Sequence, residues 1–153
     1  MSQVDATIAW QRGSQPFTDN RYSRAHEWAF DGGLRVPASS SPLSVPVPLS
    51  DPAAVDPEEA LVAATSSCHM LWFLSLAAKQ GYTVDRYTDR AFGELGKNSD
   101  QQPALTRITL RPQVDFSGAR QPTPAQLDAL HRQAHQLCTI AHSLKAEVVL
   151  ELS

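Results

Sequence analysis

A long and almost entirely apolar segment in the middle of the chain constrains the fold more than any other feature. It opens at Asp56 with the letters DPEE, in which aspartate can cap a helix, proline fits the first helical position and two acids face the positive end of the helix dipole. Its body, ALVAATSSCHMLWFLSLAA, is apolar on nearly every side, and Gly81 is a suitable stop after about Gln80. We predict a central helix that is buried on most sides and carries Cys68 in its middle.

The segment before this helix, residues 37–57, is rich in proline and predicts an extended strap. Prolines lie at positions 37, 42, 46, 48, 52 and 57, and proline lacks the amide donor that helix and sheet interiors need. A segment of this length without regular structure is uncommon inside a compact domain. We expect it to wrap a partner subunit.

Strands are predicted before the strap, within residues 1–36. Residues 4–12, 26–30 and 34–36 have strand character, and an Asp-Gly-Gly turn joins the last two as a hairpin. These strands predict a small antiparallel sheet.

Beyond the central helix, residues 82–95 and 104–116 are predicted strands, the second interrupted by a proline. Thr123 then opens a capping box that predicts a second helix through about Leu144, and residues 145–152 form a last strand. The order indicates an α+β fold with two buried helices. A length of 153 residues is that of a single domain, residues 1–153.

The composition narrows the range of functions. With 42% hydrophobic residues, 19% charged residues and a net charge of −3, the chain is globular and has no broad basic surface for nucleic acid. No run approaches the ~18 consecutive apolar residues of a membrane span, and the N-terminus lacks the features of a signal peptide. We therefore expect a cytoplasmic protein that binds neither nucleic acid nor a membrane.

Two cysteines occur, Cys68 and Cys138, each predicted in the middle of a helix. Two are too few for the disulfide framework of a small secreted domain. A cytosolic pair is either inert filling or redox chemistry, since free cysteine is often a small buried hydrophobe. Their separation along the chain neither requires nor forbids contact between the sulfurs.

Several stretches together resemble the osmotically inducible protein C and organic hydroperoxide resistance (OsmC/Ohr) superfamily. They are YSRAHEWAFDGG, the strap, VDPEEALVAATSSCHMLWFLSLAAKQG, ALTRITLRPQVDF, residues 130–135 and LCTIAHSLKAEVVLEL. The resemblance implies two central helices wrapped by antiparallel sheets in an intertwined homodimer. It also implies a thiol peroxidase that reduces organic hydroperoxides through a redox-active disulfide.

The resemblance implies four site residues. Cys68 corresponds to the peroxidatic cysteine, Cys138 to the resolving cysteine, and Arg24 and Glu58 to the family's arginine and glutamate. A thiolate rather than a thiol attacks the O–O bond, and the always-charged guanidinium of Arg24 would stabilise it. Glu58 could hold that guanidinium by a two-point ion pair, although its position near the helix start also suits a purely structural acid. Arg21 is the alternative cation.

Geometry places this site at a subunit interface. Ten residues separate Glu58 from Cys68, which is about 15 Å along one helix axis, too far for both to touch one substrate. If the central helix packs antiparallel against its symmetry mate, the partner's Glu58 can approach Cys68.

Other features leave alternatives open. Four residues recur at helical spacing in the second predicted helix: His131, His135, Cys138 and His142. The first and last of them are about 16 Å apart along the helix axis, too far to bind one metal ion together. We therefore predict core-edge or interface histidines and no metal. A small-ligand-binding module with inert cysteines is the other class of function.

Two departures from the family pattern leave the substrate open. Thr139 replaces the proline that usually follows the second cysteine of the organic hydroperoxide branch, and His69-Met70 resembles the broader osmotically inducible branch. The resemblance implies no bound cofactor but an external dithiol reductant, such as a lipoylated protein or thioredoxin. The apolar residues Leu61, Ala64, Leu71 and Trp72 around Cys68 favour a substrate with an alkyl tail.

Overall fold

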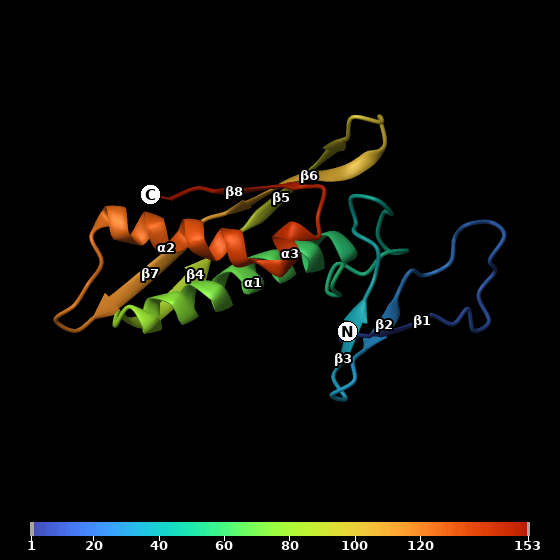
Figure 1. Cartoon of the computed structure of the whole chain (residues 1–153). Helices are drawn as coiled ribbons and strands as arrows, with labels where there is room; N and C mark the ends of the chain where they lie inside the picture. The colour runs from blue at the N-terminus through green and yellow to red at the C-terminus, as the bar shows by residue number, and fades with distance from the viewer. Residues whose placement is uncertain (1, 153) are drawn as a thin grey trace. The chain divides into compact units, whose positions relative to one another are not determined.

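A computed structural model describes residues 2–152 (Figure 1). The chain divides into two compact units, residues 2–60 and residues 61–152, and each is described by itself. The single-domain organisation stays a prediction.

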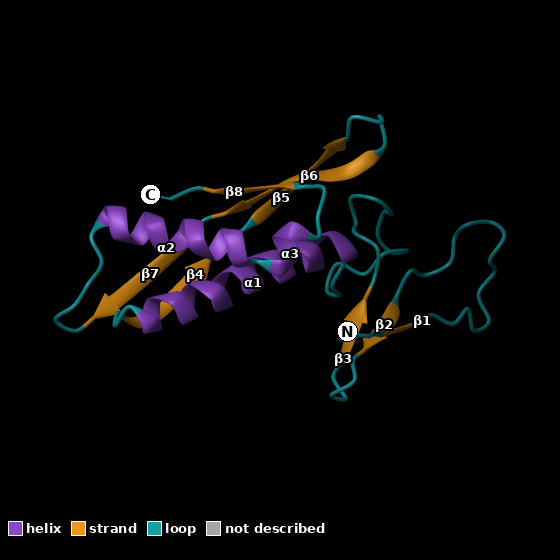
Figure 2. Cartoon of the chain, in the orientation of Figure 1, coloured by secondary structure: helices purple, strands orange, loops and turns teal. Residues whose placement is uncertain are grey.

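The first unit contains a three-stranded antiparallel sheet, as predicted. Its strands are β1 (Thr7–Ala9), β2 (His26–Ala29) and β3 (Arg35–Ala38), in the order β1-β2-β3 (Figure 2). The first strand is much shorter than the predicted 4–12. The proline-rich segment that follows consists mainly of turns, and Val55 makes a single parallel bridge to Ala38.

Helix α1 (Pro57–Lys79) begins and ends where the sequence predicts. The Asp56 and Glu59 side chains each accept the other's backbone N–H at 2.9 Å, which is a capping box. Gly81 follows the helix with φ +80°, a conformation that favours glycine.

The burial of α1 within the single chain differs from the prediction. The buried residues of the helix recur every four positions and form one line: Thr65, His69, Phe73 and Ala77. Leu71, on another side, is 61% exposed. By length and composition α1 could cross a membrane, but its buried line fits the core helix of a folded domain.

Two sheets, two helices and their connections make up the rest of the chain. The elements are β4 (Thr83–Asp89), β5 (Phe92–Lys97), β6 (Pro103–Leu110), β7 (Pro112–Ser117), α2 (Pro124–Leu137), α3 (Thr139–His142) and β8 (Glu147–Leu150). Strands β4 and β7 pair antiparallel, whereas the second sheet has the order β5-β6-β8, with β8 parallel to β6. The arrangement is α+β, as predicted.

The strand predicted over residues 82–95 was wrong as a single strand, whereas the strand over 104–116 is interrupted at the predicted proline, Pro112. Each of the two segments is divided between the two sheets. The points at which the two segments are divided are joined by hydrogen bonds. The Arg111 N–H donates to the Asp89 carboxylate at 2.7 Å. The Arg111 guanidinium donates to the carbonyl of Arg90 at 2.7 and 2.9 Å. These contacts join residues distant in the sequence, and locally only Pro112 marks a division.

The core of the second unit lies between α1, α2 and the β4-β7 sheet. Phe73 and Ala77 of α1 pack with Leu130 and Ala134 of α2 and with Tyr82. The two helices lie side by side and run in opposite directions (Figure 1).

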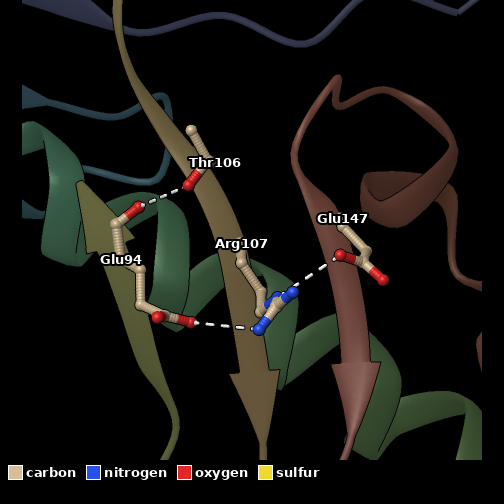
Figure 3. A network of polar contacts seen from close by, with 4 residues as sticks. All are labelled: Glu94, Thr106, Arg107 and Glu147. Atoms are coloured by element: carbon tan, nitrogen blue, oxygen red, sulfur yellow. Dashed lines mark hydrogen bonds and ion pairs between the residues drawn. The ribbon is translucent and has the colours of Figure 1, made fainter. Parts of the chain in front are cut away.

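An exposed ladder of charges crosses the β5-β6-β8 sheet. Arg107 on the middle strand lies 3.9 Å from the Glu94 carboxylate and 3.3 Å from that of Glu147 (Figure 3). Such exposed ion pairs contribute ~0–1 kcal/mol each, so they support the strand register more than the stability.

Candidate functional site

Helix α1 holds Cys68 in its middle, half-buried and reduced. The neighbouring positions on the same side of the helix, Ala64 and Leu71, are exposed in the single chain. Cys68 therefore lies at the edge of the packed core, on a rigid element.

The second cysteine, Cys138, does not lie in the middle of a helix, so that prediction was wrong. Its backbone is extended (φ −68°, ψ 107°), it ends α2, and it caps α3. Its sulfur accepts the backbone N–H of Ala141 at 3.4 Å, which satisfies a free donor of the next helical turn. The sequence carries no break signal here, since neither glycine nor proline is present.

The structure brings the two thiols together. The Cys138 side chain is buried, and the Cys68 thiol is near enough to affect its pKa. Burial raises the pKa of the Cys138 thiol and the neighbouring Cys68 raises it further, whereas the backbone N–H groups of Ala141 and Ile140 lower it. Two reduced cysteines that lie near each other are the arrangement from which a disulfide can form.

Next to this pair lies a buried histidine contact that the sequence analysis missed. The Nε2 atom of His69 on α1 lies 3.0 Å from the Nδ1 atom of His131 on α2. Burial lowers the pKa of both imidazoles to about 4, with His135 adding to the effect at His69 and Asp89 opposing it. The four-residue spacing of Thr65, His69 and Phe73 puts these residues on one side of α1. Only the packing of α1 against α2 shows that His131 is the partner of His69.

The first unit carries Arg24 and Glu58. The Arg24 guanidinium donates to the Asn20 carbonyl at 3.1 Å and to the Asn20 side chain at 3.0 Å, and it lies 3.7 Å from the centre of the Tyr22 ring. The Glu58 Oε2 atom is buried without a hydrogen-bond partner. The ion pair suggested between the two is thus not formed in the part of the chain that the structure describes.

The OsmC-like protein family model matches residues 50–153, more than half of the chain. The chain belongs to the OsmC-like family. No curated protein matches the sequence.

Solved structures extend the OsmC-like match over the whole chain. An OsmC-like protein of unknown function from Vibrio cholerae is 58% identical, with a TM-score of 0.99 and 100% of each chain covered. An organic hydroperoxide resistance protein from Elizabethkingia anophelis is 16% identical, with a TM-score of 0.70, covering 99% of this chain and 94% of its own. The protein OhrB of Bacillus subtilis is 18% identical, with a TM-score of 0.69 and 99% and 98% covered. The last two show the shared fold.

The histidine stripe predicted on the second helix of this OsmC-like chain is not formed. The helix breaks at Cys138, and beyond the break the Nε2 atom of His142 lies 2.5 Å from the Gln136 carbonyl. Within residues 2–152, no group of three or more His, Cys, Asp or Glu side chains is arranged to hold a metal ion.

Proposed function

We propose that this OsmC-like protein is a cysteine-based peroxidase that reduces organic hydroperoxides to alcohols. The observation that supports the proposal is the proximity of the two free thiols, Cys68 half-buried and Cys138 fully buried, with Cys68 near enough to raise the pKa of Cys138. Sequential oxidation of two thiols requires such proximity, because the second must reach the first before further oxidation occurs.

The proposed cycle balances in three steps. The Cys68 thiolate attacks one peroxide oxygen, the O–O bond breaks, and the alkoxide takes up a proton and leaves as the alcohol. The Cys138 sulfur then attacks the sulfenic acid on Cys68, an S–S bond forms, and the hydroxyl leaves with a proton as water. An external dithiol, such as a lipoylated protein or thioredoxin, finally reduces the disulfide and is itself oxidised.

In this proposal Arg24 stabilises the thiolate and the developing alkoxide, because its guanidinium is always charged and donates through a planar fork. Glu58 positions that guanidinium. The buried and unpartnered Oε2 atom of Glu58 supports such a role, since a carboxylate oxygen removed from water needs a donor. In the described chain the guanidinium is satisfied by Asn20, so the pairing requires a rearrangement of Arg24.

We further propose that the active protein is a homodimer whose central helices pack antiparallel. Leu71 and Ala64, beside Cys68 on α1, are exposed in the single chain. Apolar helix surface of this kind is typically covered by a partner, and a two-fold axis would bring the partner's Glu58 toward Cys68. The apolar residues around Cys68 would then favour organic hydroperoxides over hydrogen peroxide.

Serine variants test the proposed roles. Cys68→Ser should abolish peroxide consumption, because a serine hydroxyl is almost wholly protonated at neutral pH. Cys138→Ser should still consume about one peroxide per subunit, after which mass spectrometry should show added oxygens on the Cys68 peptide. Ser67→Ala, at the next exposed position of α1, is the matched control and should behave like wild type. Oxidation of Cys138 with activity retained in Cys68→Ser would mean that the roles are exchanged.

A further inference from the structure

The contact between His69 and His131 joins the two helices that carry the cysteine pair. Both imidazoles are 1% exposed, and their rings are nearly parallel, at 5°, with centroids 5.3 Å apart. A buried hydrogen bond is costly to break, because each partner loses its only contact where water cannot replace it. It therefore selects one arrangement of α1 against α2.

The pair is close in sequence to both thiols. On α1, His69 directly follows Cys68, and on α2, His131 lies two helical turns before Cys138. The ring of Phe73, one turn after His69, stacks on His131 with centroids 4.3 Å apart. The helices thus meet through an aromatic stack, a hydrogen bond and the thiol contact in succession.

The neighbouring groups indicate which nitrogen carries the proton of the His69–His131 hydrogen bond. The Nδ1 atom of His69 is buried with no partner, so a proton there would be an unsatisfied donor. We therefore assign the shared proton to Nε2 of His69, which donates to Nδ1 of His131. Asp89 on β4 does not serve as the partner of His69 Nδ1, because the Ser66 hydroxyl and the Arg111 N–H already donate to its carboxylate.

We propose that His69 and His131 are positioning residues for the disulfide step, because their hydrogen bond holds Cys68 against Cys138. Neither imidazole is placed to react with substrate. The hydrogen bond fixes the register of the helices at one point, and the thiol contact depends on that register. The proposal rests on the thiol chemistry proposed above, but the contact itself can be measured without peroxide.

The measurement is the effective concentration of the two thiols. In exchange with oxidised dithiothreitol, the protein thiols lose two hydrogens and form the disulfide, while the reagent gains them. His131→Leu, which removes the hydrogen bond, should lower the effective concentration by about tenfold or more, because the equilibrium depends steeply on geometry. His131→Asn keeps an acceptor near the position of Nδ1 and should stay within about threefold of wild type.

A structural control separates positioning from stability. Leu130→Ala removes a buried side chain beside the pair and should lower the melting temperature while leaving the effective concentration within about threefold of wild type. If His131→Leu does not fold, His69→Asn takes its place. The asparagine amide of His69→Asn is too short to reach His131, so this variant removes the hydrogen bond. The glutamine amide of His69→Gln reaches as far as the imidazole Nε2 and is the matched control.

The outcomes are distinct. A wild-type effective concentration in folded His131→Leu, or an equal loss in His131→Asn, would overturn the proposal. So would a loss in Leu130→Ala as large as that in His131→Leu. If the histidine variants behave as expected but wild type consumes no peroxide, the positioning role stands and the peroxidase proposal fails.

Discussion

The two sides of α1 differ in a way that reverses the usual pattern of a surface helix. The side packed inside the chain carries polar groups, with Thr65 and His69 fully buried, whereas the uncovered side carries Leu71, which is 61% exposed. Two of the buried polar atoms have partners: the Thr65 hydroxyl donates to the Leu61 carbonyl at 2.8 Å, and Nε2 of His69 bonds to His131, whereas Nδ1 of His69 has no partner. The difference teaches that the inner side specifies a register, whereas the outer side is the one that the proposed dimer would cover.

The largest expected effect lies on the inner side, at Phe73. This residue is fully buried and packs against both Tyr87 and His131. Phe73→Ala should lower the free energy of unfolding by ~3–5 kcal/mol, because it removes a large apolar group and leaves a cavity. Urea denaturation measures this. A loss below ~1 kcal/mol would mean that the inner side is not the core.

The pH dependence of stability sharpens the account of the same side. The pKa of His69 and of His131 is about 4 in the folded chain and about 6.5 when unfolded. The unfolded chain thus binds more protons between these values, so stability should be full above pH 6.5 and should fall as the pH drops toward 4, by ~3 kcal/mol for each imidazole.

The double variant His69→Gln/His131→Asn is the control for this prediction, because other groups titrate in the same range. The free energy of unfolding of the double variant should fall less between pH 6.5 and pH 4 than that of wild type. Parallel declines would show that the imidazoles are not buried as neutral groups.

A charged residue on the exposed side of α1 tests whether this side is covered in a dimer. Leu71→Asp should change the stability of the single chain by less than ~0.5 kcal/mol, since the side chain is exposed. It should nevertheless convert the proposed dimer to a monomer by light scattering at micromolar concentration, because a carboxylate would be buried at the interface. A wild-type protein that is already monomeric would remove the interface-site proposal.

The smallest effect is expected on the sheet surface. Arg107→Ala removes both contacts of the charge ladder in Figure 3 but should cost ~1 kcal/mol or less at low salt, and less still at high salt. A loss that persists at high salt would show that packing, rather than charge, holds this sheet together.

Local patterns predicted the ends of helices well. Thr123 and Gln126 form the capping box that the sequence predicts, and Asp56 caps α1 as predicted, with Glu59 completing a second capping box, because capping depends on residues three positions apart. The break at Cys138 was not predictable in this way, since the sulfur that caps the next turn belongs to a residue that rarely serves as a cap.

The candidate site was suggested only by the family resemblance and stays a prediction. Sequence alone left the contact between Cys68 and Cys138 open, since it depends on how α1 packs against α2. The bond between His69 and His131 depends on the same packing and joins residues 62 positions apart. Contacts between distant elements carry no local signal, which is also why the division of the predicted strand 82–95 after Asp89 was missed, whereas Pro112 marked the division of the strand 104–116.

The central claim is that the Cys68–Cys138 contact becomes a disulfide when a hydroperoxide is reduced. The most direct test treats reduced wild-type protein with one equivalent of cumene hydroperoxide and analyses the peptides by mass spectrometry. We predict that the peroxide is consumed and that the two cysteine peptides are joined, with the loss of two hydrogens and no added oxygen. Both thiols still free with the peroxide intact would contradict the claim.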